Sequence, residues 1–234
     1  MTFKYFSEKD ITDLYNKFVV KDNDYFESHK NLFWKVSSII PSNIWNSIDK
    51  DYPRLPAIVD LYNWLNKYNL NNFESVLSTC RGDPELHFIK SDKIDFAEYD
   101  GTNYDLHTLD LPKKDYEFVM MNQTLEHLYN PTHALENIYN HIKPGGYFFT
   151  SVPFLNIPHN MPFHYWGINP LGLTIMCKTI GFEVLEVGFY GSKEYLLNMF
   201  YSKYWPGINV IKETVNDPFY TAQCWILCKK VSES

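Results

Sequence analysis

The segment from residue 116 to residue 153 constrains the fold most, because two apolar runs flank one helical segment with clear start and stop signals. The run YEFVMMNQ (116–123) is almost continuously apolar, which is typical of a strand buried on both faces. In the helix that follows, Asn130 is the expected cap and Pro131 the first residue, and KPGG is the expected stop. The run YFFTSVP (147–153) then reads as a second strand, so the segment predicts two parallel neighbours in one sheet.

The same alternation of strands and helices continues through the rest of the chain. A second helix is expected to begin after Asn169, with Pro170 first, and to stop at Gly181, and the segment 191–218 is expected to be loop-rich. We expect seven strands, at 73–79, 92–100, 104–111, 116–123, 147–153, 182–190 and 221–229. This order predicts an α/β fold with a doubly wound, seven-stranded, mainly parallel, Rossmann-like sheet.

The first 70 residues have helical rather than strand patterns. Apolar residues spaced three and four apart predict amphipathic helices in EKDITDLYNKFV (8–19) and IVDLYNWLNKY (58–68), and YPRLP (52–56) is expected to break any helix between them. The chain has no low-complexity linker and no internal repeat. We therefore expect a single domain over residues 1–234: an N-terminal helical cap (1–70) and a Rossmann-like core (71–234) with a lid loop at 154–169.

Charge and hydropathy exclude some classes of partner. The formal net charge is −7 and the basic residues are scattered, so nucleic acid is not an expected partner. The N-terminus lacks a basic-then-apolar signal pattern, and no apolar run approaches the roughly 20 residues of a spanning helix. We expect a soluble, cytoplasmic protein without a membrane span.

The central block resembles class I S-adenosylmethionine-dependent methyltransferases. In these, a strand is followed by LEH, a helix with the pattern P…AL…I, KPGG and a second strand, and residues 116–154 have these motifs in register. The next segment, HNMPFHYWGINPLGLTIMCKTIGF, resembles a subset associated with glycan and polysaccharide biosynthesis. The resemblance covers roughly residues 74–190. It implies S-adenosylmethionine as cofactor and O-methylation of a sugar hydroxyl in a glycan or nucleotide sugar.

The glycine-rich first motif of the family is degenerate in this chain. Against the family pattern VLE-x-G-x-G-x-G, the sequence VLSTCRGDP has Ser78 for the acidic residue, Cys80 for the first glycine and Pro84 for the third, and it keeps Gly82. Either a rebuilt loop still binds the cofactor, aided by the N-terminal helices, or binding has been lost. We favour the rebuilt loop, because the rest of the pocket pattern survives. A helix can still begin here, with Asp83 as its cap and Pro84 in its first turn.

In this fold the cofactor lies over the carboxyl ends of the strands. Carboxylates after the second strand are expected to accept the ribose hydroxyls, although an acidic turn in solvent explains them equally well. His107 occupies the position from which the family contacts the adenine amino group. The expected cofactor-binding residues are Thr79, Cys80, Arg81, Gly82, Glu98, Tyr99, Asp100, His107, Asn122, Gln123 and Thr124.

Three histidines are the expected catalytic residues: His127 of the LEH motif, and His159 and His164 of the lid loop. A histidine titrates near neutral pH, so His127 suits the general base that deprotonates the acceptor, although it could also only shape the site. Glu126 is expected at the rim. The lid histidines are either part of the acceptor site or packed in the loop, next to a sugar platform of Phe163, Tyr165 and Trp166.

Metal binding and loss of catalysis are the alternatives. His127, His159 and Glu126 could bind a metal, but their spacing is not diagnostic, so no metal is predicted. The acceptor could instead be another small molecule with a nitrogen or oxygen nucleophile. The degenerate glycine motif leaves open a non-catalytic binding or scaffold protein with a methyltransferase-like fold, and binding of S-adenosylhomocysteine would discriminate between this and an enzyme.

Overall fold

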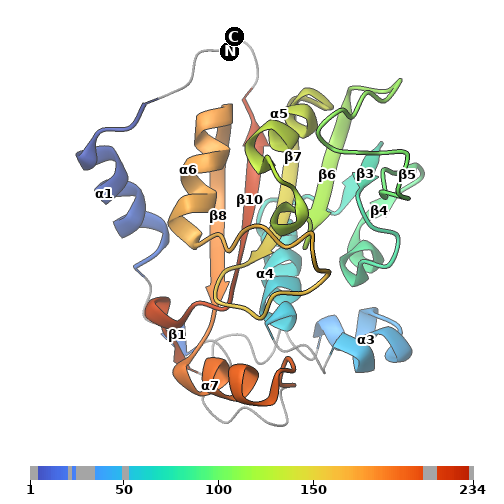
Figure 1. Ribbon diagram of the computed structural model, residues 1–234. Coiled ribbons are helices and arrows are strands. Elements are labelled where there is room, and N and C mark those ends of the chain that lie inside the picture. Colours follow the sequence, from blue (N-terminus) through green and yellow to red (C-terminus); the bar gives the residue numbers. More distant parts are fainter. Residues whose placement is uncertain (1–4, 21–22, 25–34, 49–52, 208–214, 232–234) are drawn as a thin grey trace.

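The computed structural model describes residues 5–20, 23–24, 35–48, 53–207 and 215–231. Its main feature is a six-stranded sheet with the order β5-β3-β6-β7-β10-β8 (Figure 1). Strands β5, β3, β6 and β7 are parallel, whereas β10 is antiparallel to both of its neighbours, β7 and β8. The strand bounds are Val76–Ser78 (β3), Ile94–Phe96 (β5), Tyr116–Asn122 (β6), Ile142–Pro153 (β7), Phe182–Tyr190 (β8) and Gln223–Lys230 (β10).

The α/β class and the mainly parallel sheet are confirmed, but the prediction of seven strands is wrong. Residues 104–111 form turns instead of a strand. The carboxylate of Asp105 accepts the backbone N–H of His107 (2.9 Å), and its carbonyl accepts that of Thr108 (3.0 Å), which closes a turn. The buried residues Leu106 and Leu109 lie three positions apart, a spacing that does not place two side chains on one face of a strand.

Helices cover both faces of the sheet. Helix α4 (Arg54–Lys67) packs on one face with Phe118, Phe149 and Trp225, while α5 (Pro131–Asn140) and α6 (Pro170–Ile180) pack on the other (Figure 1). The predicted helix starts are confirmed: the Asn130 side chain accepts the N–H of His133 (3.2 Å), and that of Asn169 accepts the N–H of Gly172 (2.7 Å). Gly181 ends α6 with a φ of 114°, a conformation that favours glycine.

The described N-terminal helices pack into the cores on the two faces of the sheet. Helix α1 (Glu8–Phe18) has a capping box of Ser7 and Asp10 and buries Phe18 in the same core as α6, and α3 spans Ser42–Ile48. Helix α4 is itself a layer of the fold, fixed to β10 by a hydrogen bond from Trp225 Nε1 to Asp60 Oδ2 (2.9 Å). Helix α4 begins at Arg54, inside the segment YPRLP, four residues before the predicted start. Its Pro56 lies in the first turn, where a backbone N–H has no helical partner.

Smaller elements complete the chain. Strands β2 (Asn72–Phe73) and β4 (Lys90–Ser91) pair in parallel, and β1 (Asn23–Asp24) pairs antiparallel with β9 (Val215–Asn216). The segment 191–218, expected to be loop-rich, contains helix α7 (Lys193–Ser202). The short 3₁₀ helices are η1 (Pro84–Phe88), η2 (Leu125–His127) and η3 (Pro218–Tyr220). Among the described residues, every helix is too short or too polar to cross a bilayer.

The carboxyl ends of β3, β6 and β7 meet at one edge of the sheet, where the lid loop (154–169) crosses in front of the strand ends and α7 lies below it (Figure 1). Most of the predicted site residues lie on the segments that leave this edge. The fold therefore gathers side chains from separate parts of the sequence along one edge of the sheet.

Candidate active site

Polar side chains join the tips of the two central strands. Thr79 follows β3 and Thr124 follows β6, and their hydroxyl oxygens lie 3.4 Å apart. Asn122, at the end of β6, accepts a hydrogen bond from the Ser151 hydroxyl of β7 (3.2 Å). Gln123 has a φ of 47°, a left-handed backbone conformation that turns the chain out of the strand, and its side-chain amide donates to the same serine (3.1 Å).

The degenerate glycine loop is held by its own side chains. The Ser78 hydroxyl accepts the N–H of Cys80 (3.2 Å) and donates to the carbonyl of that residue (2.8 Å), so the serine closes the turn where the family has an acidic residue. Burial raises the pKa of the Cys80 thiol. The exposed Arg81 lies over the Phe96 ring (4.4 Å) and 3.7 Å from a carboxylate oxygen of Glu98.

Asp83 does not act as the predicted helix cap, because its carboxylate is engaged elsewhere. It accepts from Arg54 Nη2 of α4 (2.7 Å) and from the Asn122 amide (3.4 Å), and η1 begins at Pro84 without a side-chain cap. Burial, reinforced by the neighbouring carboxylate of Glu85, raises the pKa of Asp83 to about 7 despite the guanidinium beside it. Sequence reasoning missed Arg54, which joins helix α4 to the loop after β3 (residues 79–83, the strand-tip loop).

The acidic segment after β5 is an exposed turn. Asp100 accepts the backbone N–H groups of Thr102 and Asn103 and the side-chain amide of Asn103, and these hydrogen bonds lower its pKa to about 2. The Tyr99 hydroxyl donates to the Gly101 carbonyl (3.1 Å). Of the two predicted carboxylates, Glu98 is the one that does not close this turn.

His107 is engaged on both ring nitrogens. Its Nδ1 lies 2.7 Å from Asp105 Oδ1, its Nε2 accepts the N–H of Asn130 (3.3 Å), and the ring stacks on Tyr129 with centroids 3.9 Å apart. Neither nitrogen is left for an adenine amino group in this arrangement. His107 instead positions the start of α5.

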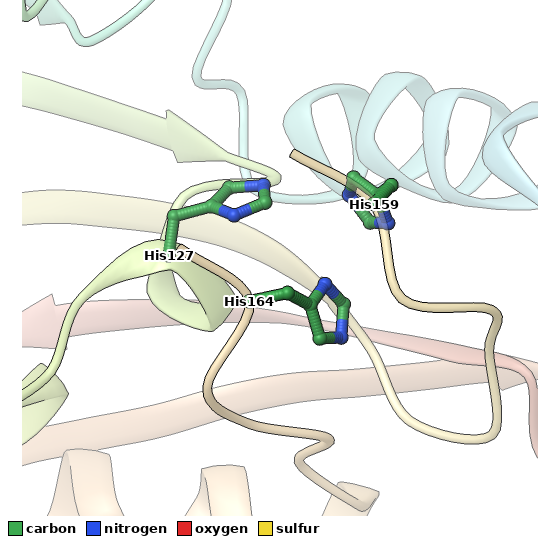
Figure 2. A group of neighbouring side chains, drawn as sticks. All are labelled: His127, His159 and His164. Atoms are coloured by element: carbon green, nitrogen blue, oxygen red, sulfur yellow. The ribbon is translucent and has the colours of Figure 1, made fainter. Parts of the chain in front are cut away.

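The three predicted catalytic histidines lie together, although they come from two segments (Figure 2). His127 closes η2, and His159 and His164 belong to the lid loop; the ring centroids are 4.7–5.8 Å apart. Burial lowers the pKa of His127 and of His164, which favours neutral rings at physiological pH. Glu126 lies beneath them, fully buried instead of at the expected rim, and its Oε1 is 3.6 Å from Nε2 of His127.

The predicted aromatic platform borders the histidines. Phe163, Tyr165 and Trp166 are each about half exposed. The Trp166 indole N–H donates to the Leu128 carbonyl (2.9 Å), and the backbone N–H of Tyr165 donates to the Glu126 carbonyl (2.8 Å). The lid loop is thereby attached to η2 or the residue after it at two points, and its three partly exposed aromatic residues adjoin His164 in the sequence.

The strand-tip loop fits a bound cofactor. A Cβ atom added to Gly82 would meet only the Cys80 sulfur, at 3.9 Å, so the backbone is open on that side to another molecule. The hydroxyls of Thr79 and Thr124 and the carboxylate of Glu98 lie on the segments that leave β3, β6 and β5, where a nucleotide with an amino-acid tail needs polar partners. The backbone at Gly82 is therefore open to a ligand, with Cys80 and Pro84 on either side of it where the family has glycines.

Comparison with known proteins agrees with this geometry. A family model described as a methyltransferase domain matches residues 57–187, more than half of the chain. The solved structure of the [4+2]-cyclase SpnF is similar over 97% of both chains at 13% identity, with a TM-score of 0.50. A protein described as a sarcosine dimethylglycine methyltransferase from Galdieria sulphuraria has a TM-score of 0.52 at 10% identity, over 77% of this chain and 87% of its own.

A SAM-dependent methyltransferase from Archaeoglobus fulgidus has 19% identity, with 74% of this chain and 94% of its own covered and a TM-score of 0.43. No curated protein sequence matches the chain. At such identities the structural likeness shows the fold alone, and the match over residues 57–187 shows the family. The chain belongs to the methyltransferase domain family, and it is an S-adenosylmethionine-dependent methyltransferase.

Proposed function

We propose that the enzyme methylates a hydroxyl oxygen of a sugar, in a glycan or a nucleotide sugar. The observation that carries the proposal is the placement of three imidazoles beside half-exposed aromatic rings, one turn beyond the tip of β6. The rings offer flat apolar faces, and the imidazoles offer nitrogen atoms to hydroxyl groups. A formal net charge of −7 gives no support to a nucleic-acid acceptor.

The acceptor would rest on the side chains of Phe163, Tyr165 and Trp166. Trp166 is suited to this role because its indole N–H is bonded to the Leu128 carbonyl, which fixes the ring while 44% of the residue stays exposed. The apolar face of a pyranose ring packs on such a surface, and its hydroxyls extend toward the imidazoles. A small amine offers no comparable face.

His127 is the group we assign to the acceptor proton. Its Nδ1 lies 2.7 Å from the Phe163 carbonyl oxygen, which can only accept, so Nδ1 carries the hydrogen and Nε2 keeps a lone pair in the neutral ring. The lowered pKa of His127 keeps that lone pair available near neutral pH. The lone pair can then accept a proton from the acceptor hydroxyl.

The strand-tip residues Thr79, Gly82, Asn122 and Thr124, with Glu98, are the ones we assign to the cofactor. When bound, S-adenosylmethionine supplies the methyl group as a carbon activated by the sulfonium. The task of the chain is to hold the acceptor oxygen in line with that carbon, and such positioning supplies much of the rate in a two-substrate reaction. The tie between Thr79 and Thr124 fixes the strand tips against each other for this purpose.

Two measurements test the proposal. Titration calorimetry with S-adenosylhomocysteine should show micromolar binding, about −8 kcal/mol; absence of binding at millimolar concentration would contradict the enzymatic function. A screen with labelled cofactor should then show transfer to sugar hydroxyls and not to amines. His127→Ala should keep S-adenosylhomocysteine binding and lose turnover, whereas His133→Ala, on the exposed face of α5, should change neither.

A further inference from the structure

The three histidines have the arrangement of a metal centre. Each residue offers one ring nitrogen, and these nitrogens all lie within 4.8 Å of one another. Figure 2 shows the three rings around a common centre, with His127 on one segment and His159 and His164 on the lid loop. Two segments that are 32 residues apart at their first histidines, 127 and 159, thus contribute to one set of nitrogen atoms.

Backbone carbonyls fix the protonation of two of these rings. Nδ1 of His127 lies 2.7 Å from the Phe163 oxygen, and Nδ1 of His159 lies 3.2 Å from the Ile157 oxygen. Because a carbonyl oxygen only accepts, both Nδ1 atoms carry hydrogen, and both Nε2 atoms keep a lone pair when the rings are neutral. Histidines that bind metals are commonly oriented by such an outer hydrogen bond.

A buried carboxylate lies against the two lone pairs. Glu126 is fully buried, and neither of its oxygens has a hydrogen-bond partner among the described residues. Its Oε1 lies 3.6 Å from Nε2 of His127 and 3.8 Å from Nε2 of His159. Buried carboxyl oxygens without a hydrogen-bond partner are costly. A cation between Glu126 and the two imidazoles would give these oxygens a partner.

His164 supplies a third unpaired atom. Its Nδ1 is buried and has no hydrogen-bond partner among the residues that the structure describes. The ring lies 4.7 Å from that of His159 and 5.8 Å from that of His127, measured between centroids. Unpaired buried polar atoms are rare in native proteins, and here they occur together on residues that are good metal ligands.

We propose that His127, His159 and His164 bind one divalent first-row transition-metal ion of the Zn²⁺ type, with the buried Glu126 carboxyl group beside it. Imidazole nitrogens with one carboxylate suit zinc and its neighbours, whereas magnesium and calcium prefer sites made of oxygen atoms. Tetrahedral zinc with bonds of about 2.0–2.1 Å places its ligand atoms about 3.4 Å apart. The nitrogens need to move inward by less than about 1 Å to reach this spacing. This inference revises the sequence-based expectation of a metal-free site.

The role of the ion rests on the proposed function. An acceptor hydroxyl beside the ion would lose its proton to solvent water more readily, because the positive charge favours the alkoxide. With the ion bound, the Nε2 lone pair of His127 is donated to the ion and no longer accepts the proton of the acceptor hydroxyl. The charge of the ion then promotes the loss of that proton. Metal binding itself does not depend on the identity of the acceptor.

Metal binding is tested on the full chain after treatment with a chelator, with ZnCl₂ in calorimetry and with Co²⁺ as a spectroscopic probe. We expect one ion per chain, a Kd below 1 μM, and a Co²⁺ visible spectrum typical of a tetrahedral nitrogen-and-oxygen site. His159→Ala and His164→Gln should each weaken binding at least 100-fold. His133→Ala, an exposed histidine outside the cluster, should leave the affinity unchanged.

The controls separate the two proposals. Circular dichroism checks that each variant is folded. Two cluster variants are used so that the test still holds if one of them does not fold. The metal inference is overturned if Zn²⁺ does not bind at 1 mM, or if it binds equally well to both cluster variants. S-adenosylhomocysteine binding without Zn²⁺ binding would overturn only the metal site, whereas Zn²⁺ binding without S-adenosylhomocysteine binding would overturn only the proposed function.

Discussion

Arg54 is the side chain whose removal most directly tests how the strand-tip loop is held. Its guanidinium lies 2.7 Å from Asp83 Oδ1 and 3.5 Å from Glu85 Oε2, and both carboxylates are almost completely buried. Arg54→Met keeps much of the side-chain volume and removes the charge. The two carboxylates then lose the cation that compensates them at the base of the loop.

The size of the effect follows from the burial. Removing one partner of a buried ion pair costs about 3–5 kcal/mol. The Arg54 side chain is 24% exposed, so solvent screens part of the interaction. We therefore expect the variant to lose about 2–3 kcal/mol of unfolding free energy at pH 8.

The loss should depend on pH in a defined direction. The pKa of Asp83 is raised in the folded protein from 3.8 to about 7, so the folded state binds more protons than the unfolded state between these values. Stability therefore falls as the pH rises through this range, and without Arg54, which favours the ionised carboxylate, the fall should continue to higher pH. At pH 5 Asp83 is protonated, and the loss in the variant should shrink to about 1 kcal/mol.

Urea unfolding of both proteins at pH 5 and pH 8 measures these losses. Lys114→Met is the matched control, because Lys114 pairs with Asp110 on the surface and its removal should have little effect at either pH. The variant Asp83→Asn should remove most of the pH dependence. Equal losses at pH 5 and pH 8, or a stable Arg54→Met protein at pH 8, would refute the reasoning.

Three further substitutions test separate parts of the structure. Gly82→Val should fold with little change in Tm, because its Cβ would make only an ordinary contact with the Cys80 sulfur, and its affinity for S-adenosylhomocysteine in calorimetry should fall at least tenfold; unchanged binding would contradict the cofactor site. Trp166→Ala should raise the KM for the acceptor and leave that for the cofactor unchanged, and a shift in the cofactor KM alone would count against the platform. Gly188→Ala should cost about 3 kcal/mol in urea unfolding, because its Cβ would lie 2.1 Å from Trp225 Nε1 and 2.6 Å from Asp60 Oδ2; a neutral effect would mean that this buried contact is not formed.

The parts of the fold that the sequence predicts well are those with local signals. The caps Asn130 and Asn169, each followed by proline, and the final Gly181 fix two helices through hydrogen bonds within four residues. The strand prediction at 104–111 is wrong. The apolar residues and the length of this segment fit a strand, but the Asp105 side chain closes a turn. An aspartate side chain that bonds the backbone two residues later competes with strand pairing, and apolar content alone does not show the outcome.

The candidate site was predicted in composition but not in geometry. His127, His159 and His164 stood out because each lies in a motif or loop beside a strand end. Their convergence depends on the hydrogen bond from the backbone N–H of Tyr165 to the carbonyl of Glu126, which joins residues 39 positions apart. No local pattern encodes such a contact, and a glutamate beside a histidine motif reads as a surface residue until the loop is seen to cover it.

Strand β10 comes last among the strands of the chain, yet it lies between β7 and β8. Strand β8 hydrogen-bonds to no other strand of the main sheet in the described residues, so it stays outside the sheet until β10 has been added. During synthesis on the ribosome, β8 and α6 must therefore wait for residues 223–230 to emerge. A nonsense codon shortly before Gln223 would give a chain in which one edge of β7 is unpaired and β8 is not part of the sheet. Such a chain should be degraded by quality-control proteases.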